Sequence, residues 1–249
     1  MSHSPDSARW GQARLMHVTA RFPHGVVTTD QFPIPLDGVL AAAARRDRLA
    51  GSYGRLVDHH VQPLPLALLP LKGPWVWAAT CAAFPGIAGT DIRWWHQRFD
   101  TVPAERVVDA LPASTDTGRF KPWRSPTVVT LADRAEWWAC GDPDGIRDIL
   151  TGVSQVGRRR GQGEGVVTGW EVVDHGPPDR DRIVWTTAGF PARPLPQAAA
   201  RTLNLCAVDT IGWTYRPPYW RPTFDGHTAS RPLRPVIAPW VVAPADAAA

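Results

Sequence analysis

The sequence predicts an α+β domain in which an antiparallel sheet is covered on one face by two helices. Three observations predict this class. The 249 residues, 44% of them hydrophobic, are enough to bury the core of one large domain. Two segments have helical periodicity, and others have the alternating or uniformly apolar pattern of strands. These segments follow one another in the order strand, helix, strand, strand, helix, strand.

The first strand is expected at residues 15–22, because apolar and polar side chains alternate there with the period of a strand. The apolar face consists of Met16, Val18, Ala20 and Phe22, and the other face of Leu15, His17, Thr19 and Arg21. We expect the face that carries His17 and Arg21 to be open to solvent or to a ligand.

The first helix is expected to follow Asp37 as its N-cap. Aspartate is a favourable cap because its carboxylate accepts hydrogen bonds from the free N–H groups of the first turn. The alanine run 41–44 favours a helix, and Gly51 is suited to end it.

Two apolar stretches follow this helix. Residues 64–71 contain Pro65 and Pro70, so we expect an extended segment or an edge strand there. Residues 75–84 are a stronger strand candidate. The stretch 85–125, with its glycine, proline and basic residues, is interpreted as an insertion that forms a β-hairpin resembling a thumb.

Strand patterns at 127–131 and 136–140 precede the clearest helix start in the chain. Asp142 is a favourable N-cap, and Pro143 takes the first helical position. Apolar side chains then recur at helical spacing on one face. They are Ile146, Ile149, Leu150 and Val153.

The last strand of the domain is expected at 166–173, which completes the β-α-β-β-α-β order of ferredoxin-like or RRM-like domains. We assign this domain to residues 1–175, with the insertion at 85–125. Residues 176–249 are a proline-rich C-terminal extension that we expect to pack on the domain. Its strand-like pieces are 182–187 and 202–208.

The composition excludes several classes of function. The net charge is +4, and 25 of the 27 cations are arginine, the residue that pairs with phosphate and stacks on bases. Cys81, Cys140 and Cys206 are far apart, so neither a zinc site nor a disulfide framework is expected. No apolar run resembles a signal peptide or a bilayer-spanning helix, which predicts a cytoplasmic protein without membrane association. We expect no metal and no cofactor.

The most informative segment is the glycine loop, residues 157–165, with the sequence Gly-Arg-Arg-Arg-Gly-Gln-Gly-Glu-Gly. Glycine lets the backbone approach a ligand closely, and the arginine guanidinium matches the geometry of phosphate. The loop follows a helix pattern and precedes a strand pattern, whereas the glycine loops that bind nucleotides precede a helix. We therefore interpret it as a loop that holds a nucleic-acid backbone; a plain connection with solvated arginines is the alternative.

Two further stretches, 91–99 and 119–124, interleave aromatic and basic residues, which is typical of surfaces that stack bases and bind phosphates. Trp94 and Trp95 face opposite ways on a strand, so either they reach between neighbouring nucleotides or one of them packs at the base of the hairpin. Tyr215 and Arg216 either stack on RNA or seal the extension against the core. The candidate RNA-binding residues are Gly157, Arg158, Arg159, Arg160, Gly161, Gln162, Gly163 and Gly165 of the loop, and His17, Arg21, Arg93, Trp94, Trp95, His96, Arg98, Lys121, Arg124, Tyr215 and Arg216 outside it.

The chain resembles the RAMP superfamily of CRISPR-associated proteins, whose RRM-like domains carry a glycine-rich loop between the last helix and the last strand. More narrowly, it resembles the five-prime-handle-binding, filament-capping subunits of type IV CRISPR complexes. Four stretches carry the resemblance in the right order: 36–41, 138–142, 156–166 with 170–172, and 216–220. Glu164 departs from the pattern, because an aromatic or apolar residue is expected at its position.

The resemblance implies a non-catalytic RNA-binding subunit that holds the five-prime end of a guide RNA and caps a helical filament of backbone subunits. The implied partners are the guide RNA, the backbone RAMP subunits and the large subunit of the complex, with target nucleic acid as a further candidate. A stand-alone RNA-binding module without CRISPR partners remains an alternative.

A metal-independent endoribonuclease on the same fold is the main alternative. Some RAMP relatives cut precursor guide RNA with general acid–base residues, often histidine, sometimes with tyrosine or lysine, that activate a ribose 2′-hydroxyl. None of the eight histidines is paired in sequence with a convincing partner. His17 and His96 are the first candidates for such a role.

Overall fold

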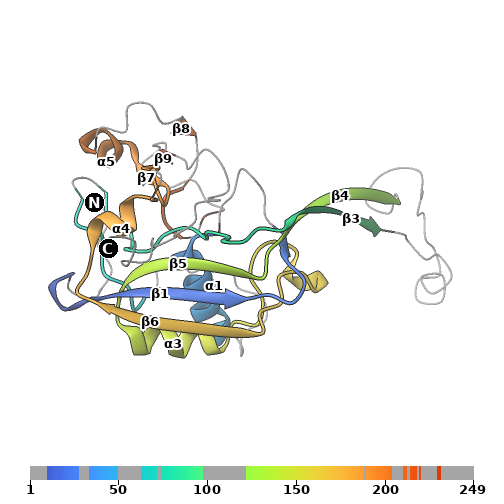
Figure 1. Ribbon diagram of the computed structural model, residues 1–249, viewed down its shortest axis with the longest axis horizontal. Coiled ribbons are helices and arrows are strands. Elements are labelled where there is room, and N and C mark those ends of the chain that lie inside the picture. Colours follow the sequence, from blue (N-terminus) through green and yellow to red (C-terminus); the bar gives the residue numbers. More distant parts are fainter. Residues whose placement is uncertain are drawn as a thin grey trace, which may run out of the picture.

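The computed structural model describes residues 10–27, 34–49, 63–71, 74–97, 122–187, 189–203, 210–211, 214–217, 219 and 229–230. Gly51, Arg98, Lys121 and most of the piece 202–208 lie outside these residues. The described chain is α+β, as the sequence predicts, with three small antiparallel sheets and a few helices (Figure 1). None of the described helices combines the length and the apolar character needed to cross a membrane.

The central sheet has the strand order β5-β1-β6. β1 (Arg14–Arg21) lies in the middle and pairs antiparallel with β5 (Arg134–Gly141) and with β6 (Gly169–Gly176). The stretch 75–84, predicted as a strand, extends this sheet beyond β5 only through isolated bridges, such as that between Ala79 and Ala139.

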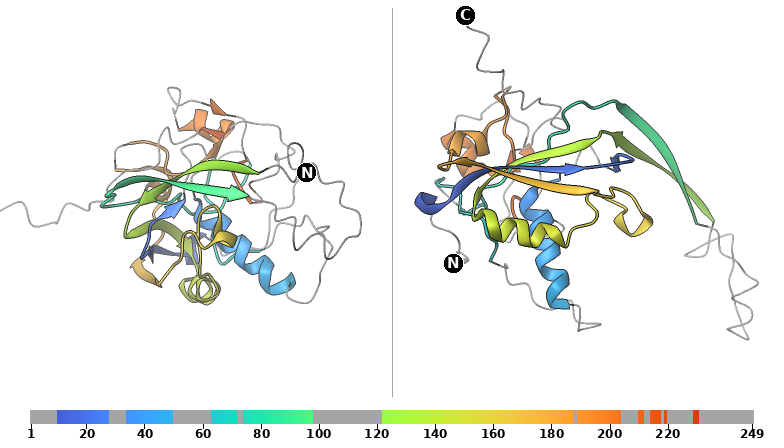
Figure 2. Two further views of the ribbon diagram at one scale, coloured as in Figure 1. Left: turned by 90° about the vertical axis from the view of Figure 1, so that its right-hand side faces the viewer. Right: turned by 60° about the horizontal axis from the view of Figure 1, so that its bottom comes forward.

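Helices α1 (Leu36–Leu49) and α3 (Pro143–Thr151) cover one face of the central sheet (Figures 1 and 2). The apolar face predicted for the first strand packs against them. The predicted cap is also confirmed, because the Asp142 side chain accepts a hydrogen bond from the Asp144 N–H. This core includes the buried side chains of Met16, Val18, Ala20, Trp137, Ile146 and Leu150.

The opposite face of the sheet is mostly covered, contrary to the prediction of an open face. Leu15 and Trp138 pack there in a second core with Ile183, Val184 and Leu195 from the chain that follows β6. The prediction failed because it considered the first strand without the apolar side chains that the extension supplies. His17 remains partly exposed on this face.

The extension does not contain the strand predicted at 182–187. Residues Arg180–Val184 form helix α4 instead, since the Asp179 carboxylate accepts hydrogen bonds from the N–H groups of Asp181 and Arg182. The rest of the described extension contains β7 (Leu195–Pro196), α5 (Gln197–Thr202), β8 (Thr210–Ile211) and β9 (Ala229–Ser230). The three strands form a sheet in the order β7-β9-β8.

A long hairpin extends from the body of the protein (Figures 1 and 2). It consists of β3 (Gly89–Gln97) and β4 (Trp123–Leu131), which pair antiparallel along their whole length. β2 (Val26–Val27) adds a short third strand at the base of β4. The stretch 127–131 therefore belongs to the hairpin and not to the central sheet.

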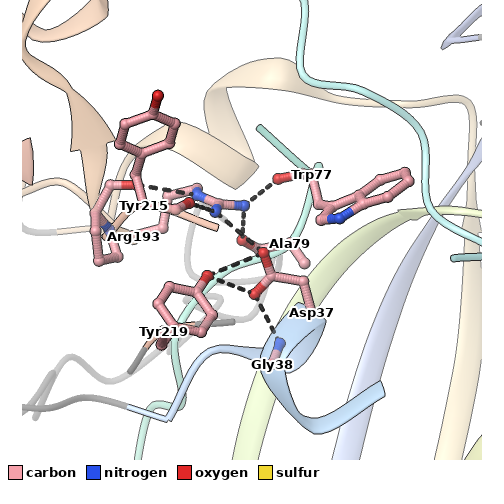
Figure 3. A network of polar contacts seen from close by, with 8 residues as sticks. Asp37, Gly38, Trp77, Ala79, Arg193, Tyr215 and Tyr219 are labelled. Carbon is pink, nitrogen blue, oxygen red and sulfur yellow. Dashed lines mark hydrogen bonds and ion pairs between the residues drawn. The ribbon is translucent and has the colours of Figure 1, made fainter. Parts of the chain in front are cut away.

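A buried polar network joins the start of α1 to the extension (Figure 3). Asp37 lies inside α1 and is fully buried, so it is not the N-cap that the sequence predicts. Its carboxylate accepts hydrogen bonds from Arg193 Nη2 at 3.2 Å and from the Tyr219 hydroxyl at 2.8 Å. Burial raises the pKa of the Tyr219 phenol well above its usual value, and the Asp37 charge adds to this effect, so the hydroxyl stays protonated and donates.

Arg193 itself is fully buried and satisfies backbone carbonyls from two segments, 75–84 and the extension. It donates to Trp77 O, to Ala79 O at 2.9 Å and to Tyr215 O at 2.8 Å. Burial works against the guanidinium charge, but Asp37, Tyr219 and Cys81 together outweigh it, and the pKa of Arg193 is raised. The guanidinium is thus a charged cross-link between the irregular segment 75–84, α1 and the extension.

Replacing Arg193 by alanine leaves Asp37 as an unpaired buried charge and frees several carbonyls. We expect Arg193→Ala to lower the free energy of unfolding by about 3–5 kcal/mol. The matched control is Arg201→Ala, which removes an exposed arginine of α5 and should cost less than about 0.5 kcal/mol. Urea denaturation followed by tryptophan fluorescence measures both, and equal losses would contradict the role given to Arg193.

Candidate nucleic-acid interface

The glycine loop lies between α3 and β6 and contains a short 3-10 turn, Arg160–Gln162. Its two ends are held together, because the Val156 N–H donates to Gly165 O at 2.8 Å and Gln155 bridges to Val166. This closure explains why the last strand begins at Gly169, three residues later than predicted. The residues between the two ends form a closed loop beside the base of the hairpin.

The backbone of the loop requires glycine at particular positions. Gly163 and Gly165 have φ values of 87° and 65°, in the left-handed region. A β-carbon at Gly165 would also collide with the carbonyl oxygen of Val156. Arg159 has a φ of 58°, the one positive value of a non-glycine among the residues that the structure describes. Gly161, in contrast, has open space around it.

Glu164, at a position where the resemblance predicts an aromatic or apolar residue, has a structural role. Its side chain is buried, and both carboxylate oxygens accept from Arg93 Nη1, at 2.9 and 2.8 Å. Arg93 comes from β3 and also donates to His24 O at 3.2 Å. The ion pair neutralises Glu164 and fastens the glycine loop to the hairpin. The role of Arg93 is therefore to position the loop.

The two tryptophans of the hairpin point in opposite directions, as predicted. Trp95 is on the side of the glycine loop, where the Arg159 guanidinium lies 5.5 Å from the centre of its ring. The Trp95 Nε1–H is buried and has no hydrogen-bond acceptor in the described part of the chain. Trp94 is on the other side, 47% exposed, with the Arg124 guanidinium 4.0 Å from its ring.

The structure brings some of the predicted RNA-binding residues together and separates others. The glycine loop, Arg93 and Trp95 lie together, and Arg21 is at the same end of the sheet, where its carbonyl accepts from Thr168 N at 2.9 Å. Exposed residues on the outer side of the hairpin are Trp94, His96 and Arg124. Arg98 and Lys121 fall outside the described residues.

Tyr215 and Arg216 do not contribute to an open surface. Tyr215 is fully buried in the second core, and Arg216 is 8% exposed with its guanidinium 4.3 Å from the centre of the Trp75 ring. Of the two predicted roles, sealing the extension against the body is therefore the one that the structure supports.

A second polar cluster lies on the face of the sheet opposite α1 and α3. His17 Nε2 lies 3.2 Å from Glu136 Oε2, and its ring is 4.6 Å from that of Trp138 and 6.1 Å from that of His175. Arg134 Nε donates to Glu136 Oε1 at 2.8 Å. Burial alone would raise the pKa of Glu136, but the bonds from His17 and Arg134 outweigh it and hold that pKa below its ordinary value.

Sequence reasoning did not find the partners of His17. In β5, Glu136 and Trp138 alternate with Trp137 and Ala139, which face the core beneath α1 and α3. Strand periodicity alone therefore assigns Glu136 and Trp138 to the face that carries His17. His175 lies outside the predicted last strand, which ends at residue 173, whereas β6 continues to Gly176 and includes it. In the described residues, no three histidine, cysteine, aspartate or glutamate side chains are placed to hold a metal ion.

No protein-family model matches the chain, and no curated protein matches it. The case for a function therefore rests on the residues and geometry described above.

Alanine at Gly165 should disrupt the glycine loop, whereas alanine at Gly161 should not. We expect Gly165→Ala to cost about 1–3 kcal/mol of stability, because it combines a left-handed backbone with a collision against Val156. Gly161→Ala should be neutral or slightly stabilising. Thermal unfolding of the two variants provides the comparison, and equal melting temperatures would show that the loop is not closed at Gly165.

The lowered pKa of Glu136 predicts a contribution to stability that depends on pH. This contribution is present above the ordinary glutamate pKa of 4.5 and is lost as the pH falls through the lower folded-state value. Glu136→Gln should therefore be less stable than the unmodified protein at pH 7, and the difference should shrink below pH 4.5. Glu171→Gln, at an exposed ion pair with Arg21, is the control and should show no such trend. Denaturant titrations at several pH values measure the effect.

Proposed function

We propose that this protein binds RNA as the non-catalytic, filament-capping subunit of a type IV CRISPR ribonucleoprotein. The five-prime end of the guide RNA lies between the glycine loop and the hairpin. The observation that carries the proposal is the ion pair of Arg93 with Glu164, because it holds the glycine loop against the hairpin, where Arg159 lies beside the Trp95 indole. Cations next to aromatic rings are the elements from which single-stranded RNA sites are built.

The arrangement of the sheet supports a ferredoxin-like or RRM-like domain. The order is β6, β1, β5 and then the segment 75–84, with α1 and α3 on one face. In such a domain the glycine loop joins the last helix to the last strand, which is where residues 157–165 lie. The β3–β4 hairpin then corresponds to the inserted thumb.

The glycine loop offers the chemistry that an RNA backbone requires. The arginines supply planar guanidinium groups for phosphate oxygens. The buried Trp95 Nε1–H, which has no acceptor in the described chain, is a further donor for a phosphate or ribose oxygen. Because Arg93 already holds Glu164, the phosphate ligands in this proposal come from Arg158, Arg159 and Arg160, of which at most two face one RNA strand.

The outer side of the hairpin supports the proposed place in a filament. Ile92, Trp94 and Val128 are 56%, 47% and 49% exposed, and the strand register places Ile92 opposite Val128. An apolar surface of this kind on a two-stranded hairpin marks an interaction site. We assign it to the neighbouring backbone subunit, and other surfaces of the chain contact the large subunit.

A second candidate function, endoribonuclease activity, is favoured by one observation. The imidazoles of His17 and His175 are neighbours on the sheet, and one of them contacts a carboxylate. Such a pair can act as general base and general acid on the ribose 2′-hydroxyl and the leaving oxygen. Labelled repeat RNA incubated with the protein in EDTA should remain intact if the capping role is right. Cleavage that His17→Ala or His175→Ala abolishes would establish the enzyme instead.

Removing the three loop arginines should weaken RNA binding and its dependence on salt. Each phosphate contact on a single strand contributes about 0.7 to the slope of log affinity against log salt. At most two of three consecutive side chains face one ligand, so replacing Arg158, Arg159 and Arg160 by alanine should reduce the slope by about 1.4. Fluorescence anisotropy with labelled repeat RNA measures this slope between roughly 50 and 300 mM salt, a range in which the screening of charges changes strongly.

The control for this experiment removes the same charge elsewhere. A variant with alanine at Arg147, Arg180 and Arg201, all exposed and outside the loop, should keep most of the slope. Identical slopes for the loop variant and the unmodified protein would refute the proposed site. A stand-alone module would bind unrelated RNA as well as repeat RNA and would not be retained by co-expressed backbone subunits.

A further inference from the structure

Three aromatic rings and a guanidinium form a cluster on the sheet face that the extension leaves partly accessible. The Trp138 ring is at the centre, 4.6 Å from His17 and 4.9 Å from His175. The Arg182 guanidinium, from α4, lies 4.7 Å from the same indole. β1, β5, β6 and α4 thus each contribute one side chain to the cluster. The glycine loop is not part of it.

The charges around this cluster are matched in pairs. Arg134 contacts Glu136 at 2.8 Å, Arg14 contacts Asp174 at 2.9 Å, and Arg182 lies 3.9 Å from Asp179. Each of these arginines therefore has a carboxylate beside it. The arginine charges are therefore offset by carboxylates, and the His175 imidazole is the group of the cluster whose charge we expect to change.

His175 is the imidazole that is poised to change charge. It is exposed, and no hydrogen bond to it is formed within the described residues. Partial burial lowers its pKa, the positive charges of His17 and Arg182 lower it further, and Asp174 opposes them. His175 is therefore neutral at pH 7. An anion bound beside His17, His175 and Arg182 would offset the positive charges that lower the pKa of His175. It would therefore favour the protonated form of His175.

We propose that His17, His175 and Arg182 form a second anion-binding site, which takes a phosphate group and binds a proton on the His175 imidazole together with it. The exposed Val173, opposite His17 in the sheet register, offers an apolar contact for a base or ribose next to that phosphate. Where the phosphate belongs to RNA, the proposal rests on the proposed function. A small free oxyanion has the same recognition chemistry.

If a proton binds together with the phosphate group, the affinity of the site for the phosphate increases as the pH falls. A phosphodiester keeps one negative charge throughout the range from pH 8 to pH 6, so a change in affinity there reports on the protein. Glu136 stays ionised in this range, because its pKa is below the ordinary glutamate value. Uptake of one proton changes the affinity by at most tenfold per pH unit, and partial uptake predicts RNA binding about three- to tenfold tighter at pH 6 than at pH 8.

The test measures the affinity of an oligoribonucleotide with a five-prime hydroxyl at pH 6, 7 and 8. Three proteins are compared: the unmodified chain, His175→Ala and His24→Ala. The last variant removes an exposed imidazole and keeps the backbone carbonyl of residue 24, which accepts a hydrogen bond from Arg93. We expect the pH dependence to persist in His24→Ala and to be lost in His175→Ala. His175→Gln, which keeps a polar side chain at this exposed position, should behave like the alanine variant if only the protonated imidazole binds.

A second measurement follows the His175 imidazole directly by proton NMR, with the oligoribonucleotide or with sulfate, whose charge does not change in this range. A rise of the His175 pKa with either ligand supports the site, and the ligand that produces it identifies the source of the anion. An unchanged His175 pKa with both ligands, or a pH dependence that survives in His175→Ala, would overturn the proposal. So would RNA cleavage that depends on His175, since the pair would then be catalytic.

The outcomes also separate this site from the proposed function. If the RNA binds with the expected salt slope but without pH dependence, the second site is absent while the glycine loop is right. If sulfate raises the His175 pKa while RNA does not bind at any pH, the anion site exists and the RNA-binding function fails.

Discussion

The buried ion pair of Arg193 and Asp37 is the contact on which the rest of the fold depends. The segment 75–84 forms only isolated bridges to β5, so a regular ladder does not satisfy all of its carbonyls. Arg193 supplies the missing donors to Trp77 and Ala79 and pairs with the carboxylate at the start of α1 (Figure 3). A buried guanidinium is stable only with such partners. The extension, which carries Arg193, is therefore an integral part of the domain.

This arrangement leaves little of the central sheet open to a ligand. One face is filled by α1 and α3, and the other by apolar residues of α4 and the chain after it. What remains is the end of the sheet where the glycine loop and the hairpin meet, and the small area around His17 and His175. Both areas combine arginines with aromatic rings, and they differ in what supplies positive charge. In the glycine loop the positive charge comes from three consecutive arginines, whereas around His175 we propose that it comes from protonation of the imidazole.

The local parts of the fold could be predicted from the sequence, whereas the contacts between distant segments could not. Strand alternation placed Met16, Val18 and Ala20 in the core, and the capping rule placed the start of α3, because both effects involve neighbouring residues only. Asp37 satisfies the same capping rule but is bonded to Arg193, 156 residues further along the chain. The helix α4 was missed for a similar reason. Its β-branched residues favour a strand, and the Asp179 cap together with packing against Trp138 overrides that preference.

The contact between Arg93 and Glu164 gives a physical reason for an acidic residue beside the arginines of the glycine loop. Without anchoring contacts, a loop with four glycines would have many conformations, and ordering it on binding would cost affinity. Closure at Val156 and Gly165 fixes the two ends, and the Glu164 carboxylate fixes the far side against β3. The negative charge is consumed in the pair with Arg93, so it does not repel a phosphate at Arg158 or Arg160. The ion pair joins the loop to the hairpin. It therefore fixes the position of Arg159 relative to the Trp95 indole in the protein without a ligand.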